Sequence, residues 1–422
     1  MSHQNENLEW KKNLKFILVT IPMFMGYATC FNLQRYMKET LMVEPGLFST
    51  AYGFLYMGNL LFRFFHNYFW IFTKPFWRII ISYASMCCAE ICMIIVQIVK
   101  WDPKKNNSWL AFITFAFAGV GIGTFESNVL SVMSIVSPGA RYFSVIGIPV
   151  GVNIITIFSF LIIGAFEGVA TPGHVCAFIF GVVIVMMIVA TIILFVYVPH
   201  GKFISKNDYK EINEDGTTSY KQDDDQTTSI HYLPNAFKNY KKWLPQVLPN
   251  ALSMCANMFT VSQFAPGIVL YTINSSRFVK FLGMTMKADY YRCIFGVLTF
   301  LGDFCSRLIF EKVKFIFPPM FLMANLIGVL MVISGIPEVM IIGNFMIMFS
   351  NGIIYVQTSK WIKEVTKGTD YNLSSYSFWL FVGDLGSVVA SFTQQSLVQG
   401  ICVDMRGKMQ GRWDPCPYYD KI

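Results

Sequence analysis

Long apolar segments recur along nearly the whole chain, and each is about as long as a helix that crosses a lipid bilayer. A bilayer core of about 30 Å requires roughly 20 apolar residues in a helix. Backbone polar groups in hydrocarbon need partners within the protein, so we predict helices here rather than short alternating strands. Eleven segments meet the required length, and they lie at residues 14–34, 48–69, 77–99, 110–136, 142–165, 174–198, 247–271, 290–310, 315–335, 338–360 and 374–397. The pattern predicts an all-α polytopic membrane protein with eleven transmembrane helices.

One long polar segment, residues 199–242, interrupts this pattern and contains three consecutive aspartates that start at Asp223. Such a segment is too polar to build a core, so we expect a flexible cytoplasmic linker. The linker would separate an N-terminal six-helix bundle (residues 1–198) from a C-terminal five-helix bundle (residues 243–397), with a polar tail at residues 398–422. Transporters built from two bundles place the substrate between them.

Composition agrees with a membrane protein, because 54% of the residues are hydrophobic and only 14% are charged. Soluble domains are about 25% charged. The net charge of +8 comes from Lys and Arg in short loops and in the linker, which the positive-inside rule explains without nucleic acid as a partner. Their distribution favours a cytoplasmic N-terminus and a C-terminus outside. We expect an integral membrane protein, with the plasma membrane favoured over an internal membrane.

Cysteine and histidine residues do not indicate a metal site, a cofactor or an enzyme. Most of the ten cysteines lie in or beside apolar segments, and Cys402 and Cys416 would pair only if the tail faces an oxidising compartment. The chain has no CxxC pattern, and none of its five histidines belongs to an HExxH motif. A phosphate-binding loop of the form GxxxxGK[ST] is also missing, which argues against transport driven directly by ATP.

Several ionisable side chains lie within the apolar segments, where even a lenient scale gives a cost of about 2.5–3.5 kcal/mol for each charge. Each therefore needs a partner or a water-filled cavity. These residues are Arg63, Glu90, Glu126, Asp303, Arg307 and Asp384.

Two of these positions allow a more specific expectation. Asp303 and Arg307 are four residues apart on one helical face, so their side chains can meet. They could be a static pair inside one bundle or a pair near the substrate path. Glu126 could be a neutral acid that donates a hydrogen bond, a proton carrier, or a buried acid bonded to a neighbouring helix.

Short motifs on successive segments together resemble one transporter family. In chain order they are Gly26 to Asn32, Glu126, Ser137-Pro138-Gly139 through Gly151, Ala251-Leu252-Ser253 through Pro266, Asp303-x-x-x-Arg307, and Ser350-Asn351-Gly352. The series resembles the equilibrative nucleoside transporter family. It departs from that family at Phe31, where the family has Trp, and at Glu126, where the family usually has Gln.

The resemblance implies a fold like that of the major facilitator superfamily and a transporter of nucleosides or nucleobases, purines favoured, working by alternating access. It also implies that Phe31, Glu126, Asp303, Arg307 and Asn351 bind the substrate. Glu126 in place of Gln leaves open the substrate range and the choice between facilitative and proton-coupled transport. The alternatives are a transporter of another small polar solute on the same fold and, less favoured, a membrane-embedded enzyme.

Overall fold

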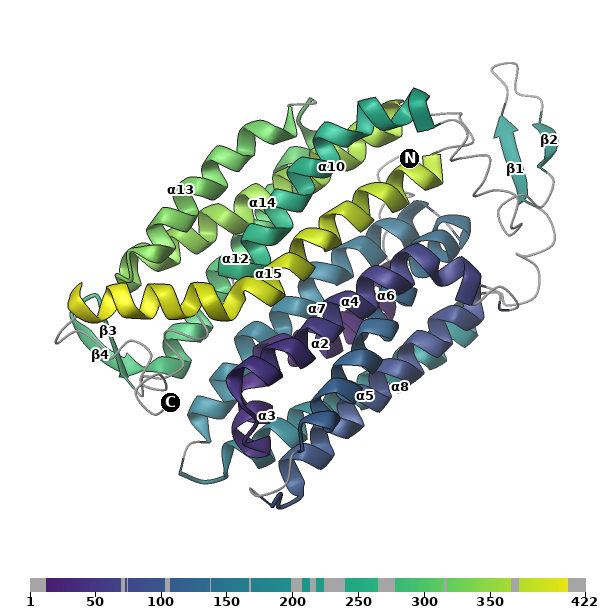
Figure 1. Ribbon diagram of the computed structural model, residues 1–422. Helices are drawn as coiled ribbons and strands as arrows, with labels where there is room; N and C mark the ends of the chain where they lie inside the picture. The colour runs from purple at the N-terminus through teal and green to yellow at the C-terminus, as the bar shows by residue number, and fades with distance from the viewer. Residues whose placement is uncertain are drawn as a thin grey trace, which may run out of the picture.

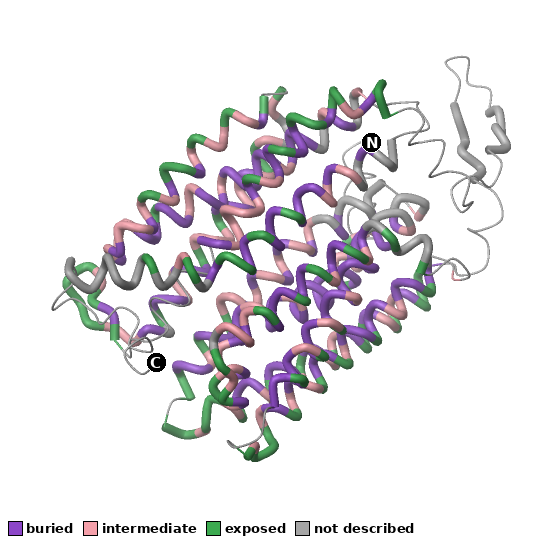
Figure 2. Tube along the Cα trace, in the orientation of Figure 1, coloured by how far each residue is buried: buried purple, intermediate pink, exposed green. Residues whose placement is uncertain are grey.

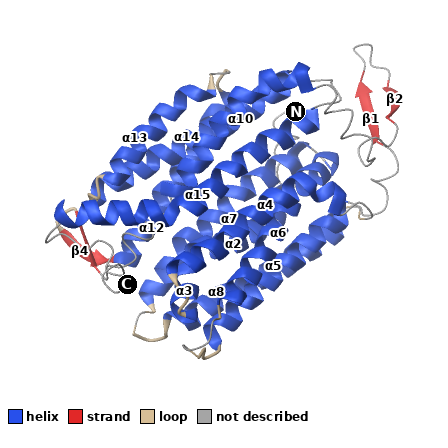
Figure 3. Cartoon of the chain, in the orientation of Figure 1, coloured by secondary structure: helices blue, strands red, loops and turns tan. Residues whose placement is uncertain are grey.

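The computed structural model is built almost entirely of helices (Figure 3). It describes residues 13–408 apart from 70–72, 74, 103–106, 137, 167, 199–206, 213–217, 224–239, 265–277, 315–316 and 366–371. The helices of the N-terminal half are α2 (Ile17–Asn32), α3 (Gln34–Leu41), α4 (Pro45–Phe69), α5 (Pro75–Ile98), α6 (Ser108–Val136), α7 (Pro138–Ala165) and α8 (Pro172–Tyr197). Those of the C-terminal half are α10 (Tyr240–Ser262), α12 (Ala288–Lys312), α13 (Leu322–Ile333), α14 (Pro337–Val365) and α15 (Asn372–Lys408).

Each predicted apolar segment contains a helix. Within the described residues, seven helices are long and apolar enough to cross a bilayer: Leu14–Asn32, Phe76–Ile98, Ser108–Glu126, Ile146–Ala165, Pro172–Tyr197, Tyr290–Phe310 and Pro337–Thr358. Helices α4, α10, α13 and α15 are not among them. α13 is short, whereas α4 and α15 carry buried polar residues, including Arg63 and Asp384, which lower their hydropathy.

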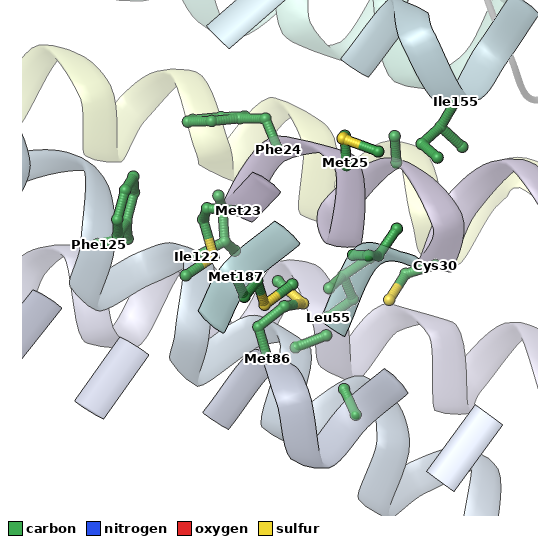
Figure 4. Close-up of a cluster of buried hydrophobic side chains, with 14 of the residues drawn as sticks. Met23, Phe24, Met25, Cys30, Leu55, Met86, Ile122, Phe125, Ile155 and Met187 are labelled. Carbon is green, nitrogen blue, oxygen red and sulfur yellow. The ribbon is translucent and has the colours of Figure 1, made fainter. Parts of the chain in front are cut away.

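The two halves form separate groups of helices that lie against each other (Figure 1). A large hydrophobic core fills the N-terminal half and also includes Val388 of α15, and two smaller cores fill the C-terminal half. Figure 4 shows part of the large core, where Met23 of α2 lies near Met86 of α5 and Met187 of α8. Each half can therefore keep its own packing if the two halves move relative to each other.

Large apolar side chains remain exposed on peripheral helices (Figure 2). On α13 these are Met323, Leu326, Ile327 and Leu330, and on α8 they include Phe178, Val185, Ile188, Ile192 and Val196. Contiguous apolar surface of this kind is unusual on a soluble monomer. It is the surface that a helix facing lipid tails would present.

Contact between the halves runs along two helix pairs, α4 with α15 and α7 with α12. On the first pair, Ser49 Oγ donates a hydrogen bond to the backbone oxygen of Ser391 at 3.3 Å. On the second pair, the Arg292 guanidinium lies 5.5 Å from the centre of the Phe160 ring. These contacts come from residues far apart in the sequence.

Glycines bring the backbones of α4 and α6 unusually close. A Cβ atom on Gly119 would lie 2.7 Å from the backbone oxygen of Leu55, and one on Gly123 would lie 2.7 Å from that of Asn59. Small residues allow this approach between membrane helices. One turn further along, the same approach places Arg63 of α4 beside Glu126 of α6.

Two hairpins, together with the length of the last helix, differ from the sequence-based expectation. The polar segment contains a hairpin of β1 (Asn207–Ile212) and β2 (Thr218–Asp223), and the rest of that segment before α10 lies outside the described residues. A second hairpin, β3 (Phe278–Phe281) with β4 (Met284–Lys287), precedes α12.

Helix α15 continues to Lys408, so the last helix does not end at residue 397. A helix bonds its own backbone whatever its side chains, so polar residues do not by themselves end it. Cys416, one of the two cysteines of the suggested Cys402–Cys416 pair, lies outside the described residues.

The close approach of α4 and α6 predicts that Gly119→Ala destabilises the protein by about 1–3 kcal/mol, because the added methyl group meets backbone rather than a movable side chain. The matched control is Gly181→Ala on α8, where no atom lies within 4 Å of the place that the added methyl group would take. That variant should be neutral or slightly stabilised. Thermal unfolding of the purified proteins in detergent measures both, and equal midpoints would contradict the packing.

Candidate functional site

Arg63 connects the two halves through a pair of buried ionic contacts. Its Nη2 donates to Glu126 Oε2 of α6, within the N-terminal half. Its Nε lies 3.0 Å from Asp384 Oδ2 of α15, in the C-terminal half. The two groups form an ion pair, but their geometry is not that of a hydrogen bond. All three side chains are at least nine-tenths buried. Loss of Arg63 would leave two buried acids without this cation.

Glu126 is bonded to a neighbouring helix, the arrangement described by one of the three alternatives that its position allowed. A guanidinium group has only donors, so the Glu126 oxygen accepts this bond. Glu126 also interacts electrostatically with Arg307 of α12. The acid thus bonds to a cation of its own half and is within electrostatic range of a cation of the opposite half.

The predicted pairing of Asp303 with Arg307 is confirmed. Arg307 Nε donates to Asp303 Oδ1 at 3.0 Å, across one turn of α12. The Arg307 guanidinium also lies 4.5 Å from the centre of the Tyr355 ring on α14. A cation over an aromatic face is attracted by the ring electrons, so Tyr355 helps to hold the guanidinium in place.

A chain of buried amides ends on the same carboxylate. Asn325 Nδ2 donates to Asn257 Oδ1 at 2.9 Å, and Asn257 Nδ2 donates to Asn351 Oδ1 at 2.7 Å. Asn351 Nδ2 then donates to Asp303 Oδ1 at 3.0 Å. The chain joins α13, α10, α14 and α12, and so it fixes the position of Asp303 relative to four helices. Linked hydrogen bonds of this kind favour one arrangement of the core.

Both hydrogen-bond donors reach the same oxygen of Asp303. Arg307 and Asn351 each bond to Oδ1, and Oδ2 has no donor among the described residues. A carboxylate has four acceptor positions on its two oxygens. Asp303 Oδ2 is therefore available to accept a hydrogen bond from a ligand.

Aromatic side chains from three helices surround these charges. Tyr27 of α2 interacts electrostatically with Arg63, Asp384 and Tyr56. The Phe31 ring packs edge-on against Tyr27, with 5.5 Å between ring centres. Phe31 thus lies one turn beyond Tyr27, and Tyr27 is within electrostatic range of the Arg63–Asp384 ion pair.

The structure brings the sequence-predicted residues together in two groups. Arg307 and Asn351 both bond to Asp303, Glu126 bonds to Arg63, and Phe31 packs against Tyr27. The sequence indicated Arg63 and Asp384 only as buried charges in need of partners. Asn257 and Asn325 were missed, because a single amide in a membrane helix is more often a contact between helices than part of a site.

No cluster of three or more His, Cys, Asp or Glu side chains suited to a metal ion occurs in the part of the chain that the structure describes. The candidate site is therefore made of charged groups, amides and aromatic rings. These groups bind by hydrogen bonding, ion pairing and stacking.

The sequence matches no protein-family model and no curated protein. Solved structures do match. A peptide transporter POT in complex with alafosfalin aligns with a TM-score of 0.62 and 11% identity, over 91% of this chain and 88% of that chain. A bacterial homolog of the human lysosomal transporter Spinster, in an inward-facing and occupied conformation, aligns with a TM-score of 0.59 and 11% identity, over 93% of this chain and 83% of its own.

A third match is the Major Facilitator Superfamily transporter FucP in the outward conformation. It aligns with a TM-score of 0.55 and 11% identity, over 91% of this chain and 97% of that chain. At such identities the likeness establishes the fold alone. The long apolar helices and these alignments indicate an integral membrane protein with the fold of the major facilitator superfamily.

Proposed function

We propose that the protein is a membrane transporter that moves nucleosides or nucleobases, with purines favoured, by alternating access. The observation that carries the proposal is the pair of ionic clusters at the contact of the two halves. One half supplies Arg63 and Glu126, and the other supplies Asp384, Asp303 and Arg307. Intramembrane charges of this kind mark substrate pathways in transporters.

The available groups suit a flat, uncharged solute that forms hydrogen bonds. Asp303 Oδ2 can accept, the guanidinium nitrogens of Arg307 beyond Nε can donate, and Tyr355 offers a ring nearby. Purine bases and nucleosides carry donors, acceptors and a planar ring. Glu126, Asp303 and Asp384 outnumber Arg63 and Arg307, which disfavours an anionic substrate such as a nucleotide.

In this proposal eleven helices cross the membrane in a six-plus-five arrangement. The helices found in all eleven predicted segments support it, as does the division of the helices into two groups around residues 199–239. The excess of Lys and Arg puts the N-terminus in the cytoplasm and the C-terminus outside, with the plasma membrane as the favoured location.

Alternating access gives the contacts between the halves a specific role. The Arg63–Asp384 pair and the Ser49–Ser391 hydrogen bond both join α4 to α15. A rocking motion that exposes the site first to one side and then to the other must break and remake contacts of this kind. Cores that lie almost entirely within one half or the other allow such a motion.

Another polar solute on the same fold is the alternative. Two observations favour it: the matched structures include peptide transporters, and none of the three matches described is named as a nucleoside transporter. A small peptide would also find donors and acceptors at Asp303 and Arg307. A substrate panel for this protein therefore needs to include peptides.

Radiolabelled uptake in oocytes that express this chain tests the proposed function. We expect saturable uptake of adenosine and hypoxanthine, with weaker uptake of uridine and none of a dipeptide. Background uptake of all nucleosides and bases, with the protein shown at the cell surface, would refute the proposal. Saturable dipeptide uptake alone would establish the alternative.

The Asp303–Arg307 pair predicts that Asp303→Asn and Arg307→Lys each lower uptake efficiency about tenfold or more. A hydrogen bond to a charged group is worth roughly 1.5–3 kcal/mol, and about 1.4 kcal/mol is a tenfold change. The control is Glu39→Gln, which breaks the exposed Arg35–Glu39 pair of the same spacing on α3. Near-normal uptake by both site variants at equal surface expression would exclude the pair from binding.

The contact of α4 with α15 predicts that joining the two helices stops transport. In the double variant Ser49→Cys with Ser391→Cys, a short bifunctional thiol reagent with a reducible spacer should abolish uptake, and a reductant should restore it. Each single variant is the control for the native cysteines. A protease site inserted within residues 224–239 lets electrophoresis detect the cross-link, because cut halves then stay together. Full uptake in the cross-linked protein would contradict motion at this contact.

A further inference from the structure

Glu90 is a buried acid that belongs to neither ionic cluster. It lies on α5 and is fully buried, and its Oε1 is 2.5 Å from Thr29 Oγ1 on α2. Its other oxygen, Oε2, is also buried and has no hydrogen-bond partner among the described residues. An ionised carboxylate held in this way would be strongly destabilised.

Thr29 has one hydroxyl hydrogen and two close oxygen neighbours. Thr29 Oγ1 is 2.6 Å from the backbone oxygen of Gly26 and 2.5 Å from Glu90 Oε1. A hydroxyl group has one hydrogen, and a backbone oxygen has none. If the Thr29 hydrogen is donated to Gly26, the second contact is a hydrogen bond only when Glu90 supplies the hydrogen. This geometry fits a carboxylic acid that donates to Thr29.

The packing around Glu90 is apolar. A Cβ atom on Gly26 would lie 3.2 Å from Glu90 Oε1, 2.8 Å from the Met86 side chain and 2.6 Å from that of Met187. The two methionines lie together in the core of the N-terminal half (Figure 4). The glycine allows α2 to approach α5 closely enough for Thr29 to reach the carboxyl group.

Helices packed against α5 supply no cation to this acid. Neither α2 nor α8 contains a Lys or Arg, and α8 has its one titratable histidine, His174, at its first turn. The titratable groups near Glu90 are the thiols of Cys30 on α2 and Cys87 on α5 itself. Cysteine thiols do not neutralise a carboxylate.

Among the described residues, the charged groups of α3 and α6 and the one at the start of α5 are distant from Glu90 or already bonded. The charged residue of α6, Glu126, is bonded to Arg63. Arg78, at the start of α5, donates to the backbone oxygen of Thr73. The charged helix α3 meets α5 near Gln97, which is about 10 Å along the helix from Glu90.

We propose that Glu90 is a proton-binding site, where a carboxyl proton joins α5 to α2 and is released and rebound during transport. The inference rests on the proposed function and extends it to proton coupling. Release leaves the carboxylate and transfers the proton to water, and rebinding reverses this step. Helix α2 also carries Tyr27 and Phe31, so a change at Thr29 reaches the candidate site through one rigid helix.

Infrared spectroscopy of the purified full chain in lipid nanodiscs tests the proton site without any substrate. We expect the carbonyl band of a protonated carboxylic acid at neutral pH, its loss in Glu90→Gln, and its retention in Glu39→Gln. Monodisperse elution of Glu90→Gln confirms folding, which its isosteric amide should preserve. An unchanged band in Glu90→Gln, or no such band in the unmodified protein, would overturn the proton site.

Uptake measured across external pH tests the coupling. High external pH favours loss of the proton, so uptake by the unmodified protein should fall as pH rises above neutral. Glu90→Gln mimics the neutral acid permanently and should lose this response, whereas Glu39→Gln should keep it. A flat response in the unmodified protein, or the same response in Glu90→Gln, would overturn the coupling. If no member of the substrate panel is taken up, the proposed function fails, and the infrared experiment still decides the proton site.

Discussion

One guanidinium group holds together acids from two helices that belong to different halves of the protein. Arg63 contacts Glu126 within its own half and Asp384 across the boundary. In a low-dielectric interior such contacts are strong, and none of the three charges is stable alone. The position of Arg63 depends in turn on the glycine-mediated approach of α4 and α6 at Gly119 and Gly123. Close packing of the α4 and α6 backbones thus positions the Arg63 side chain, which contacts the other half.

The C-terminal half prepares its part of the site differently. Asp303 is held by Arg307 and by the amide chain that starts at Asn325, so four helices fix one carboxylate. Contact across the boundary is concentrated on two helix pairs, α4 with α15 and α7 with α12, and it includes the Arg63–Asp384 ion pair and the Ser49–Ser391 hydrogen bond. A boundary of this kind between two well-packed groups of helices suits two bodies that move relative to each other. It also separates residues that hold the site in place from those that would change partners.

Acids in this protein differ in what they can do because their surroundings differ. Glu126 and Asp384 share a cation, whereas Glu90 has only a hydroxyl group and apolar neighbours. Glu126 was one candidate for a proton carrier on its sequence position. The Glu126 side chain is bonded to Arg63, whereas Oε2 of Glu90 has no hydrogen-bond partner among the described residues, which makes Glu90 the better candidate. That distinction rests on contacts between helices.

The order of amino acids was enough to predict a helical chain that lies in a membrane, because each apolar segment is long enough to satisfy its own backbone in lipid. It was also enough to predict the Asp303–Arg307 pair, because residues four apart share a helical face. The partners on different helices became known only from the fold: Arg63 with Glu126 and Asp384, Asn351 with Asn257 and Asn325, and Glu90 with Thr29. Helical spacing fixes neighbours within one helix, whereas the packing of the helices fixes neighbours between them.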